Sequence, residues 1–366
     1  IIPDAVTHLE GGFLNGLALR TLRLGKGMRA VDPAVFTATV IGQVEVDPDN
    51  PWLSTDGTAL FSKDGTCLYA CAARHGDYRI AEGCVTVGKK AFVSDKALTS
   101  VGLPSTLTGI DEFAFAKSGL TEVEIPGSVE WIGEKAFYYC SDLKKVTLNA
   151  GIERIGDEAF AKSCISSIEV PRTVRSLGYR AFSGTHVGFS GEGATFSLEA
   201  GNDHLMFDAN GGLYQTDDDG DMVFLELLGD VEEYAVQPGT RRIAPNACRF
   251  RYQLKRVSVP EGVTEIGDSA FRGCERLEAV DLPDSLEEIG DKVFLETSLD
   301  GLRLSARLRS IGSRALIVES ENPARRLPPI QWIDLDPANE DFYFVNGMLC
   351  QRDAENGDIL LRYVGP

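Results

Sequence analysis

Residues 120–148 read LTEVEIPGSVEWIGEKAFYYCSDLKKVTL, and this stretch decides the fold of the chain. Two patterns alternate in it, an apolar ladder and an aromatic motif: Leu120-x-x-Val123-x-Ile125-Pro126 and Ile132-Gly133-x-x-Ala136-Phe137. The ladder that starts at Leu120 begins again at Leu143. Self-similarity with a period of about 20 to 50 residues is typical of solenoid proteins. The stretch is therefore a little more than one unit of a repeat.

The aromatic position of this unit recurs along the chain. It is occupied by Leu14, Phe36, Phe92, Phe115, Phe137, Phe160, Phe182, Cys248, Phe271, Phe294 and Leu316. Eight of the ten intervals between these positions are equal to within one position, and the other two, which end at Phe92 and Cys248, are more than twice as long. The residue five positions earlier is aliphatic in every case. Because one such unit is too small to bury its own apolar side chains, the units are expected to stack into a continuous core.

Each unit is expected to contain one β-strand. Apolar residues alternate in the ladder, which ends at a proline in several units, and this predicts a short strand followed by a turn. One strand per repeat requires neighbouring units to pair in parallel. The Ala-Phe position predicts a short helix or 3₁₀ turn, and the preceding glycine, Gly133 in the quoted stretch, is expected to relax a tight bend. The predicted fold is an α/β repeat, a solenoid with a parallel sheet on one face.

The two long intervals predict β-hairpin insertions. Asp-Gly and Asn-Gly pairs lie between apolar runs in both intervals and again near the end of the chain, and such pairs favour tight hairpin turns. We expect one solenoid over residues 1–366, truncated at both ends. Its predicted parts are N-terminal repeats (1–43), a hairpin insertion (44–86), central repeats (87–190), a second insertion (191–242), C-terminal repeats (243–318) and an incomplete third insertion (319–366).

Composition excludes several classes of partner. The chain has 55 acidic and 36 basic residues, for a net charge of -19. Nucleic acid and anionic lipid surfaces would be repelled by such a protein. No apolar run reaches the roughly 18 residues of a membrane-spanning helix, so no membrane insertion is expected. The first residues, Ile1 to Asp4, do not resemble a signal peptide, although one would be missing if it had been removed before residue 1.

The sequence contains no recognisable catalytic or metal-binding motif, so we expect no enzymatic activity and no cofactor. The four histidines do not have metal-ligand spacing: His8, His75, His186 and His204. The acidic run from Asp217 to Asp221 resembles the start of a calcium loop, but its twelfth position is Leu228, where a calcium loop needs a glutamate. A solvated hairpin tip is the expected structure there.

The eight cysteines are widely spaced, unlike those of a small disulfide-rich domain. Cys140 and Cys274 occupy the same position of the repeat, three residues after the aromatic position, and Cys164 falls one residue later. We expect these three to be small buried apolar residues. The spacing of Cys67 and Cys71 is compatible with a disulfide or half of a metal site, but no second pair of ligands accompanies it.

The repeat resembles the BspA-like leucine-rich repeats of bacterial surface proteins. The resemblance is carried by one motif: Ile125, Pro126, Val129, Ile132, Gly133, Ala136, Phe137, Cys140 and Leu143. It covers nearly the whole chain, with Cys248 and Leu316 as departures at the aromatic position. The resemblance implies a secreted or surface-anchored location and a role in adhesion or in binding host and matrix proteins. It does not imply a particular ligand, because one fold hosts many functions.

The outward-facing residues of the ladder strands are the first candidates for an interaction surface, because repeat arrays commonly bind along an extended face. The candidate residues are Thr121, Glu122, Lys144, Lys145, Lys255 and Arg256. The leading hypothesis is a non-enzymatic surface protein that binds a protein or glycan partner. The alternative is a structural spacer without a ligand. A contiguous patch of exposed aromatics would favour binding, and Tyr138 and Tyr139 are the only adjacent aromatics in the regular repeats.

Overall fold

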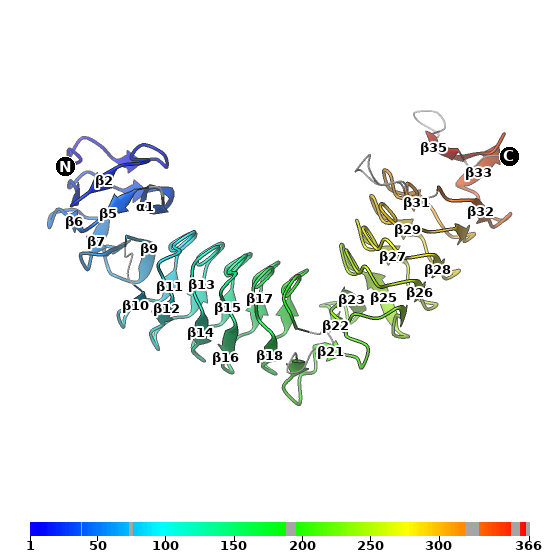
Figure 1. Ribbon diagram of the computed structural model, residues 1–366, viewed down its shortest axis with the longest axis horizontal. Helices are drawn as coiled ribbons and strands as arrows, with labels where there is room; N and C mark the ends of the chain where they lie inside the picture. The colour runs from blue at the N-terminus through cyan, green and yellow to red at the C-terminus, as the bar shows by residue number, and fades with distance from the viewer. Residues whose placement is uncertain (38, 73–75, 188–194, 319–328, 353–358, 364–366) are drawn as a thin grey trace. The chain divides into compact units, whose positions relative to one another are not determined.

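A computed structural model describes the chain except for residues 38, 73–75, 188–194, 319–328, 353–358 and 364–366. The chain divides into two compact units, each described by itself below. Unit 1 comprises Ile1–Val187 and Gly191–Asp203, and unit 2 comprises Gly188–Ser190 and His204–Pro366. In each unit the chain winds into stacked coils, one for each repeat, with parallel strands from successive coils side by side (Figure 1).

The ladders of unit 1 form a parallel sheet, as the sequence predicted. Its strands, in spatial order, are β14 (Glu122–Ile125), β16 (Lys145–Leu148), β18 (Ser167–Val170) and β20 (Thr195–Leu198). Val123 lies opposite Val146, which holds the same position in the next repeat, so the register equals the repeat length. Shorter parallel pairs precede this sheet: β1 (His8–Leu9) with β4 (Ala30–Val31), β2 (Ala18–Leu19) with β5 (Val40–Ile41), β3 (Leu22–Leu24) with β6 (Val44–Val46), and β10 (Asp77–Arg79) with β12 (Ser100–Gly102).

A second parallel sheet lies on another side of the coils, where the sequence analysis predicted only one sheet. It consists of two-residue strands: β11 (Thr86–Val87), β13 (Gly109–Ile110), β15 (Trp131–Ile132), β17 (Arg154–Ile155) and β19 (Ser176–Leu177). Each strand ends at the aliphatic residue five positions before the aromatic one, and these aliphatic side chains are buried. Two residues per coil are too few for a visible alternation of apolar and polar positions, which is why the pattern did not reveal this sheet.

The predicted short helix at the Ala-Phe position is not confirmed. The described residues contain one four-residue helix, α1 (Ala34–Thr37), and the other coils have turns there. Backbone amides alternate in their acceptors: Ala114 N donates to Asp111 O within its coil (3.1 Å), whereas Phe115 N donates to Ala136 O of the next coil (2.8 Å). A helix would use every amide within the segment. Here half of them bind neighbouring coils, and the helix is replaced by stacked turns.

The aromatic residues stack in a buried column inside the coils. Consecutive rings from Phe92 to Phe182 have centroids 4.9–5.5 Å apart, and their planes are nearly parallel. All of these rings are at most 1% exposed. In unit 2, Phe271 and Phe294 stack in the same way at 5.8 Å. Truncating one such ring to alanine removes both apolar burial and packing, a loss of about 3–5 kcal/mol.

The glycine of the aromatic motif, Gly133, does not relax a tight bend as the sequence analysis predicted. Gly133 does not adopt a positive φ, so no tight bend requires it. A Cβ at Gly133 would lie 2.8 Å from the backbone nitrogen of Glu112 in the preceding coil, closer than side chains approach backbone. Gly156 is in the same position, with 2.6 Å to the nitrogen of Glu134. These glycines allow two coils to approach each other.

The first long interval holds an antiparallel meander, made of β7 (Leu53–Thr55), β8 (Ala59–Ser62) and β9 (Cys67–Cys71). The prediction of a separate hairpin insertion is not confirmed, because both ends of this segment belong to the coils. β6 pairs in parallel with β3 of the ladder series, and β9 pairs in parallel with β11. The segment is a modified coil whose extra strands extend the short-strand sheet.

Unit 2 repeats this plan. The meander β21 (Leu205–Phe207), β22 (Gly212–Thr216) and β23 (Met222–Leu227) extends a parallel sheet of β25 (Thr240–Ile243), β27 (Glu265–Ile266), β29 (Glu288–Ile289) and β31 (Ser310–Ile311). Its ladders are β24 (Glu233–Ala235), β26 (Arg256–Ser258) and β28 (Ala279–Asp281), then the pair β30 (Gly301–Leu304) and β32 (Trp332–Leu335). A last antiparallel sheet consists of β33 (Phe342–Val345), β34 (Met348–Gln351) and β35 (Ile359–Tyr363). Residues 191–194 and 319–328, which the sequence analysis assigned to insertions, lie outside the described residues.

A buried asparagine fixes the modified coils to the preceding coil. The Asn50 side chain donates to Gly25 O (2.9 Å) and Met28 O (2.8 Å), and its oxygen accepts from the backbone amides of Trp52 and Leu53. Asn339 makes the equivalent four hydrogen bonds in unit 2, to Ser305 O, Leu308 O and two amides of its own loop. Asn202 donates to Pro171 O and Val174 O in the same manner. The sequence repeats Asp-Pro-x-Asn at residues 47–50 and 336–339, but this likeness did not indicate which backbone groups the asparagine would bind.

Candidate interaction surface

Four of the six predicted surface residues come together on the ladder sheet of unit 1. Glu122 on β14 lies directly opposite Lys145 on β16. The amide of Lys144 donates to Thr121 O at 2.9 Å, so these two residues are neighbours as well. All four side chains are exposed. The strand pleat turns Glu122 and Lys145 away from the buried Val123 and Val146, whereas Thr121 and Lys144 lie just before the two strands begin. We call Thr121, Glu122, Lys144 and Lys145 the ladder patch.

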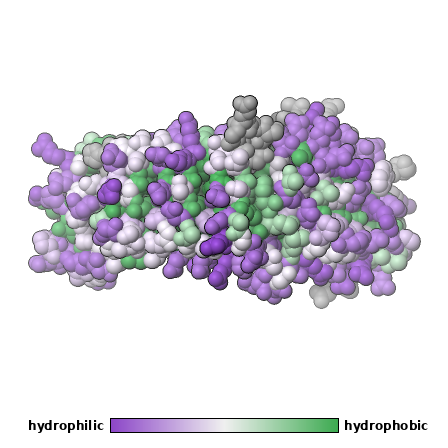
Figure 2. Space-filling view, turned by 90° about the horizontal axis from the view of Figure 1, so that it is seen from below, coloured by the Kyte–Doolittle hydropathy of each residue, from purple (hydrophilic) through white to green (hydrophobic). Residues whose placement is uncertain are grey.

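A shallow groove of about 250 Å³ runs beside the ladder patch. Its polar lining comes from three adjacent strands: Ser100 of β12, Glu122 and Glu124 of β14, and Lys145 and Thr147 of β16. On the side of the molecule that Figure 2 shows, hydrophilic and apolar residues are interspersed. Among the described residues, neither Lys144 nor Lys145 forms an ion pair. The ladder patch therefore offers two ammonium groups that are not paired with the nearby carboxylates of Glu122 and Glu124.

The other two predicted residues lie in unit 2, on and beside β26. Lys255 forms an ion pair with Glu232 (2.8 Å), and Arg256 forms one with Asp281 (2.9 Å). The hydrogen bond from Lys255 lowers the pKa of the Glu232 carboxyl below its ordinary value. All four side chains are well exposed, and such surface pairs contribute little to stability. They do, however, neutralise the positive charge that made Lys255 and Arg256 candidates.

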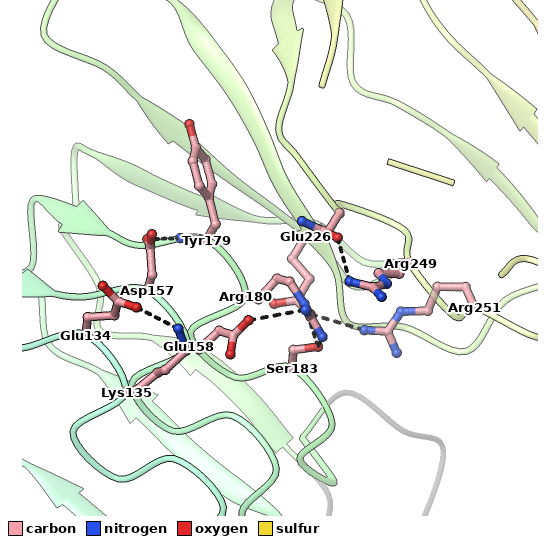
Figure 3. Close-up of polar contacts among 11 residues, drawn as sticks. Glu134, Lys135, Asp157, Glu158, Tyr179, Arg180, Ser183, Glu226, Arg249 and Arg251 are labelled. Carbon is pink, nitrogen blue, oxygen red and sulfur yellow. Dashed lines mark hydrogen bonds and ion pairs between the residues drawn. The ribbon is translucent and has the colours of Figure 1, made fainter. Parts of the chain in front are cut away.

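The turns that carry the aromatic motif stack in a column, which we call the turn column. Charged side chains connect successive coils along the turn column of unit 1 (Figure 3). Arg180 donates to Glu158 at 3.3 Å, and Asp157 accepts the backbone amide of Tyr179 at 2.8 Å. Burial is the main cause that raises the pKa of Asp157 above its ordinary value. These contacts satisfy polar groups between successive coils.

No cluster of three or more metal-ligand side chains occurs among the described residues. His8, His186 and His204 are exposed, and His75 lies outside the described part of the chain. At the acidic run, Asp217 accepts the backbone amides of Asp219 (3.0 Å) and Asp221 (2.9 Å) and pairs with Arg242. Its carboxylate is therefore occupied by its own turn, as expected for a hairpin tip.

No disulfide joins Cys67 to Cys71 in the structure. Cys140 and Cys274 are completely buried, as predicted, and each thiol donates to a backbone carbonyl of the preceding coil, at 3.1 and 2.9 Å. Cys164 is only partly buried. Burial raises the pKa of Cys274 to about 12, so this thiol stays protonated and unreactive.

The sequence analysis missed one buried polar network, in unit 2. The hydroxyls of Tyr214 and Tyr234 lie 2.5 Å apart, and Tyr234 donates to Asp208 at 2.6 Å. Burial is the main cause that raises the pKa of both tyrosines. Gln237 also donates to Asp208. Because the donors come from different strands and loops, no local spacing in the sequence could have revealed the network, which joins the meander to the ladder strand β24.

The profile of the family described as BspA type leucine rich repeat region matches residues 66–187 and 241–321, in six copies. These ranges contain the regular coils described above and make up more than half of the chain. The chain belongs to this family. As a BspA-type protein it is a leucine-rich-repeat β-solenoid of about 13 turns of about 23 residues, with almost no helix.

Solved structures with the same fold include bacterial leucine-rich-repeat proteins. The pneumococcal vaccine antigen PcpA has a TM-score of 0.61 and 23% identity, with 91% of this chain and 75% of PcpA covered. A leucine-rich cell surface protein from Faecalibacterium prausnitzii A2-165 has a TM-score of 0.57 and 20% identity, with 84% and 73% covered. No curated protein sequence shows significant similarity to this BspA-type chain. No helix in the described residues is long and apolar enough to cross a bilayer.

Proposed function

We propose that this BspA-type chain is a non-enzymatic, surface-exposed repeat protein that binds a protein or glycan partner outside the bacterial cell. The observation that carries the proposal is the ladder patch, in which Lys144 and Lys145 are exposed and form no ion pair with other described residues. In the same unit, Lys26, Lys89 and Lys135 are paired with carboxylates, and the ladder patch is distinguished by two consecutive lysines that both lack an ion pair with described residues. The family and the neighbouring cell-surface protein support an extracellular location.

The ladder patch is suited to a partner with a small number of negative groups. Its strands are held in register by parallel pairing, so the backbone positions that carry these side chains are fixed before binding. Exposed charges mainly increase the rate and the specificity of association, so the binding should weaken as salt increases. The competing hypothesis, a structural spacer, requires no such unpaired charges.

The test uses the full chain on arrays of matrix proteins and glycans. We expect a partner to be retained at micromolar concentration, and a Lys144→Glu, Lys145→Glu variant to bind it at least tenfold more weakly. The matched control is Lys255→Glu, Arg256→Glu, which reverses two charges in unit 2 that are already paired and should leave binding unchanged. If the wild-type chain retains nothing at micromolar concentration, the result counts against the binding proposal and favours the spacer hypothesis. Equal binding by both variants and the wild type would exclude the ladder patch.

A further inference from the structure

The turn column of unit 1 carries a second exposed feature, formed by aromatic and basic side chains. Lys117, Tyr139 and Lys162 occupy the same position on three successive coils, two residues after the buried phenylalanine. Each has a positive φ, of 57° to 59°. Their amides are fixed between coils: Lys117 N donates to Tyr138 O and Tyr139 N donates to Ala161 O, both at 2.8 Å. The backbone thus holds these side chains side by side.

A hollow of about 340 Å³ lies against the two tyrosines, lined by Lys96, Lys117, Tyr138 and Tyr139. The tyrosine rings are 6.1 Å apart between centroids and inclined by 45°, and Tyr139 is 48% exposed. The ammonium of Lys162 lies 5.4 and 5.8 Å from the centroids of the two rings without lining the hollow. The hollow is therefore lined by two aromatic side chains and by two further lysines. We call these five residues the Tyr–Lys site.

The charges of the Tyr–Lys site are not neutralised within the described protein. None of Lys96, Lys117 and Lys162 forms an ion pair with a described residue, and the Lys96 ammonium instead donates a long hydrogen bond to the carbonyl of Ser118 at 3.4 Å. What distinguishes Lys96, Lys117 and Lys162 is their position on neighbouring coils beside two tyrosine rings. Ammonium groups attract carboxylate and sulfate, and an exposed ring face packs against the C–H face of a flat ligand.

We propose that the Tyr–Lys site binds an anionic saccharide, with a sugar ring against Tyr138 and Tyr139 and a carboxylate or sulfate near Lys96 and Lys117. A peptide is less suitable, because the amides of Lys117 and Tyr139 are already bonded between coils and cannot pair with an added strand. A long nucleic acid would meet the negative charge of the remaining protein. The site rests on the proposed binding function but not on the ladder patch.

The repeat itself supplies variants that should fold. The positions equivalent to Tyr138 are Ala116 and Ala161 in the adjacent coils, and the position equivalent to Tyr139 is Gly184 two coils later, also with positive φ. A Tyr138→Ala, Tyr139→Gly variant thus places in this coil residues that neighbouring coils already use. A Lys117→Gln, Lys162→Gln variant removes two charges and leaves the rings in place. Thermal unfolding verifies that each variant keeps its fold.

The test is calorimetric titration of the full chain with sialyllactose and with a sulfated uronic acid–hexosamine tetrasaccharide, using lactose as the uncharged probe. At least one anionic saccharide should bind, lactose at least tenfold more weakly, and affinity should fall with salt. Both Tyr–Lys variants should weaken binding at least tenfold, whereas Lys144→Glu, Lys145→Glu should not. Binding that is lost only in the latter variant would overturn this proposal and support the ladder patch. No binding of either anionic saccharide, or binding only of an acidic peptide, would also overturn it. The Lys144→Glu, Lys145→Glu variant reports on the ladder patch and the two Tyr–Lys variants report on the Tyr–Lys site, so failure of one site is distinguishable from failure of the other.

Discussion

At the scale of single residues, Asp157 shows how a polar side chain serves two coils. Its carboxylate accepts the amide of Tyr179 from the next coil, so a backbone group that would otherwise lack an acceptor is satisfied. The equivalent contact occurs in unit 2, where Asp268 accepts the amide of Asp291 and Asp291 accepts that of Ser313. The pKa of Asp157 is raised, mainly by burial, and the charges of Glu134 and Glu158 act in the same direction. The hydrogen bond of Asp157 therefore stabilises the fold, whereas its negative charge destabilises it.

Replacing Asp157 with asparagine should therefore stabilise unit 1 at neutral pH. A carboxyl with a raised pKa in the folded state stabilises the fold only below the unfolded pKa, near 3.8, and this contribution is lost as the pH rises through the folded pKa. Asp157→Asn should be more stable than the wild type at pH 7 and equal to it at pH 3, in urea unfolding followed by circular dichroism. The control, Asp157→Ala, should be about 0.5–1.5 kcal/mol less stable than the wild type at both pH values, because it lacks the acceptor for the Tyr179 amide. A wild type that is more stable than Asp157→Asn at pH 7 would contradict this account.

At the scale of elements, each modified coil depends on its buried asparagine. Asn50 is fully buried and joins the loop before β7 to the backbone of the preceding coil through four hydrogen bonds. Alanine at this position would leave two carbonyls and two amides without this partner. A buried polar group that loses its partner costs about 1–3 kcal/mol.

We expect Asn50→Ala to loosen the meander β7–β9 by at least about 2 kcal/mol, because more than one buried group loses its partner. Hydrogen exchange followed by mass spectrometry measures this directly, as faster exchange of the amides in that meander. The matched control is Asp49→Ala, at the neighbouring exposed position, which should change stability by less than about 0.5 kcal/mol. Identical exchange in the two variants would show that the asparagine is dispensable.

At the scale of the whole molecule, the stack is additive. Within each unit, successive coils contact each other through parallel strands, stacked phenylalanines and amides shared between turns. The stability of such an array is approximately the sum of coil and interface contributions. The repeat length is fixed by these contacts, because a shift by a single residue would bring a charged ladder residue to the buried face.

Removing one complete coil should therefore preserve the fold. Deletion of residues 131–153 joins Glu130 to Arg154, which occupies the register position of Trp131. We expect a cooperative thermal transition and an unchanged β-sheet circular dichroism per residue, with a lower melting temperature because one interface is lost. Deletion of residues 131–142, about half a coil, should abolish cooperative unfolding. A complete-coil deletion that behaves like the half-coil deletion would exclude additive stacking.

The sequence by itself determined the coil. The nearly constant period, the ladder of Val123 and Ile125, and the aliphatic residue before each Phe set the repeat length, the parallel ladder sheet and the buried column, because stacking is the only way these side chains leave water. Sequence reasoning also placed Thr121, Glu122, Lys144 and Lys145 on one surface, since their distance along the chain equals the coil length.

Only the tertiary structure decided what depends on contacts between coils. Turns replace the predicted helix because alternate amides, such as that of Phe115, bond to the next coil, and a propensity for local structure contains no information about a neighbouring carbonyl. A glycine is required at position 133 because the backbone of the preceding coil lies too close for a Cβ. An asparagine is required at position 50 because its side chain donates to carbonyls one full coil earlier in the chain. The same holds for the candidate sites. Ion pairs between coils neutralise Lys255 and Arg256, whereas stacking places Lys96, Lys117 and Lys162 beside Tyr138 and Tyr139 without a carboxylate partner among the described residues.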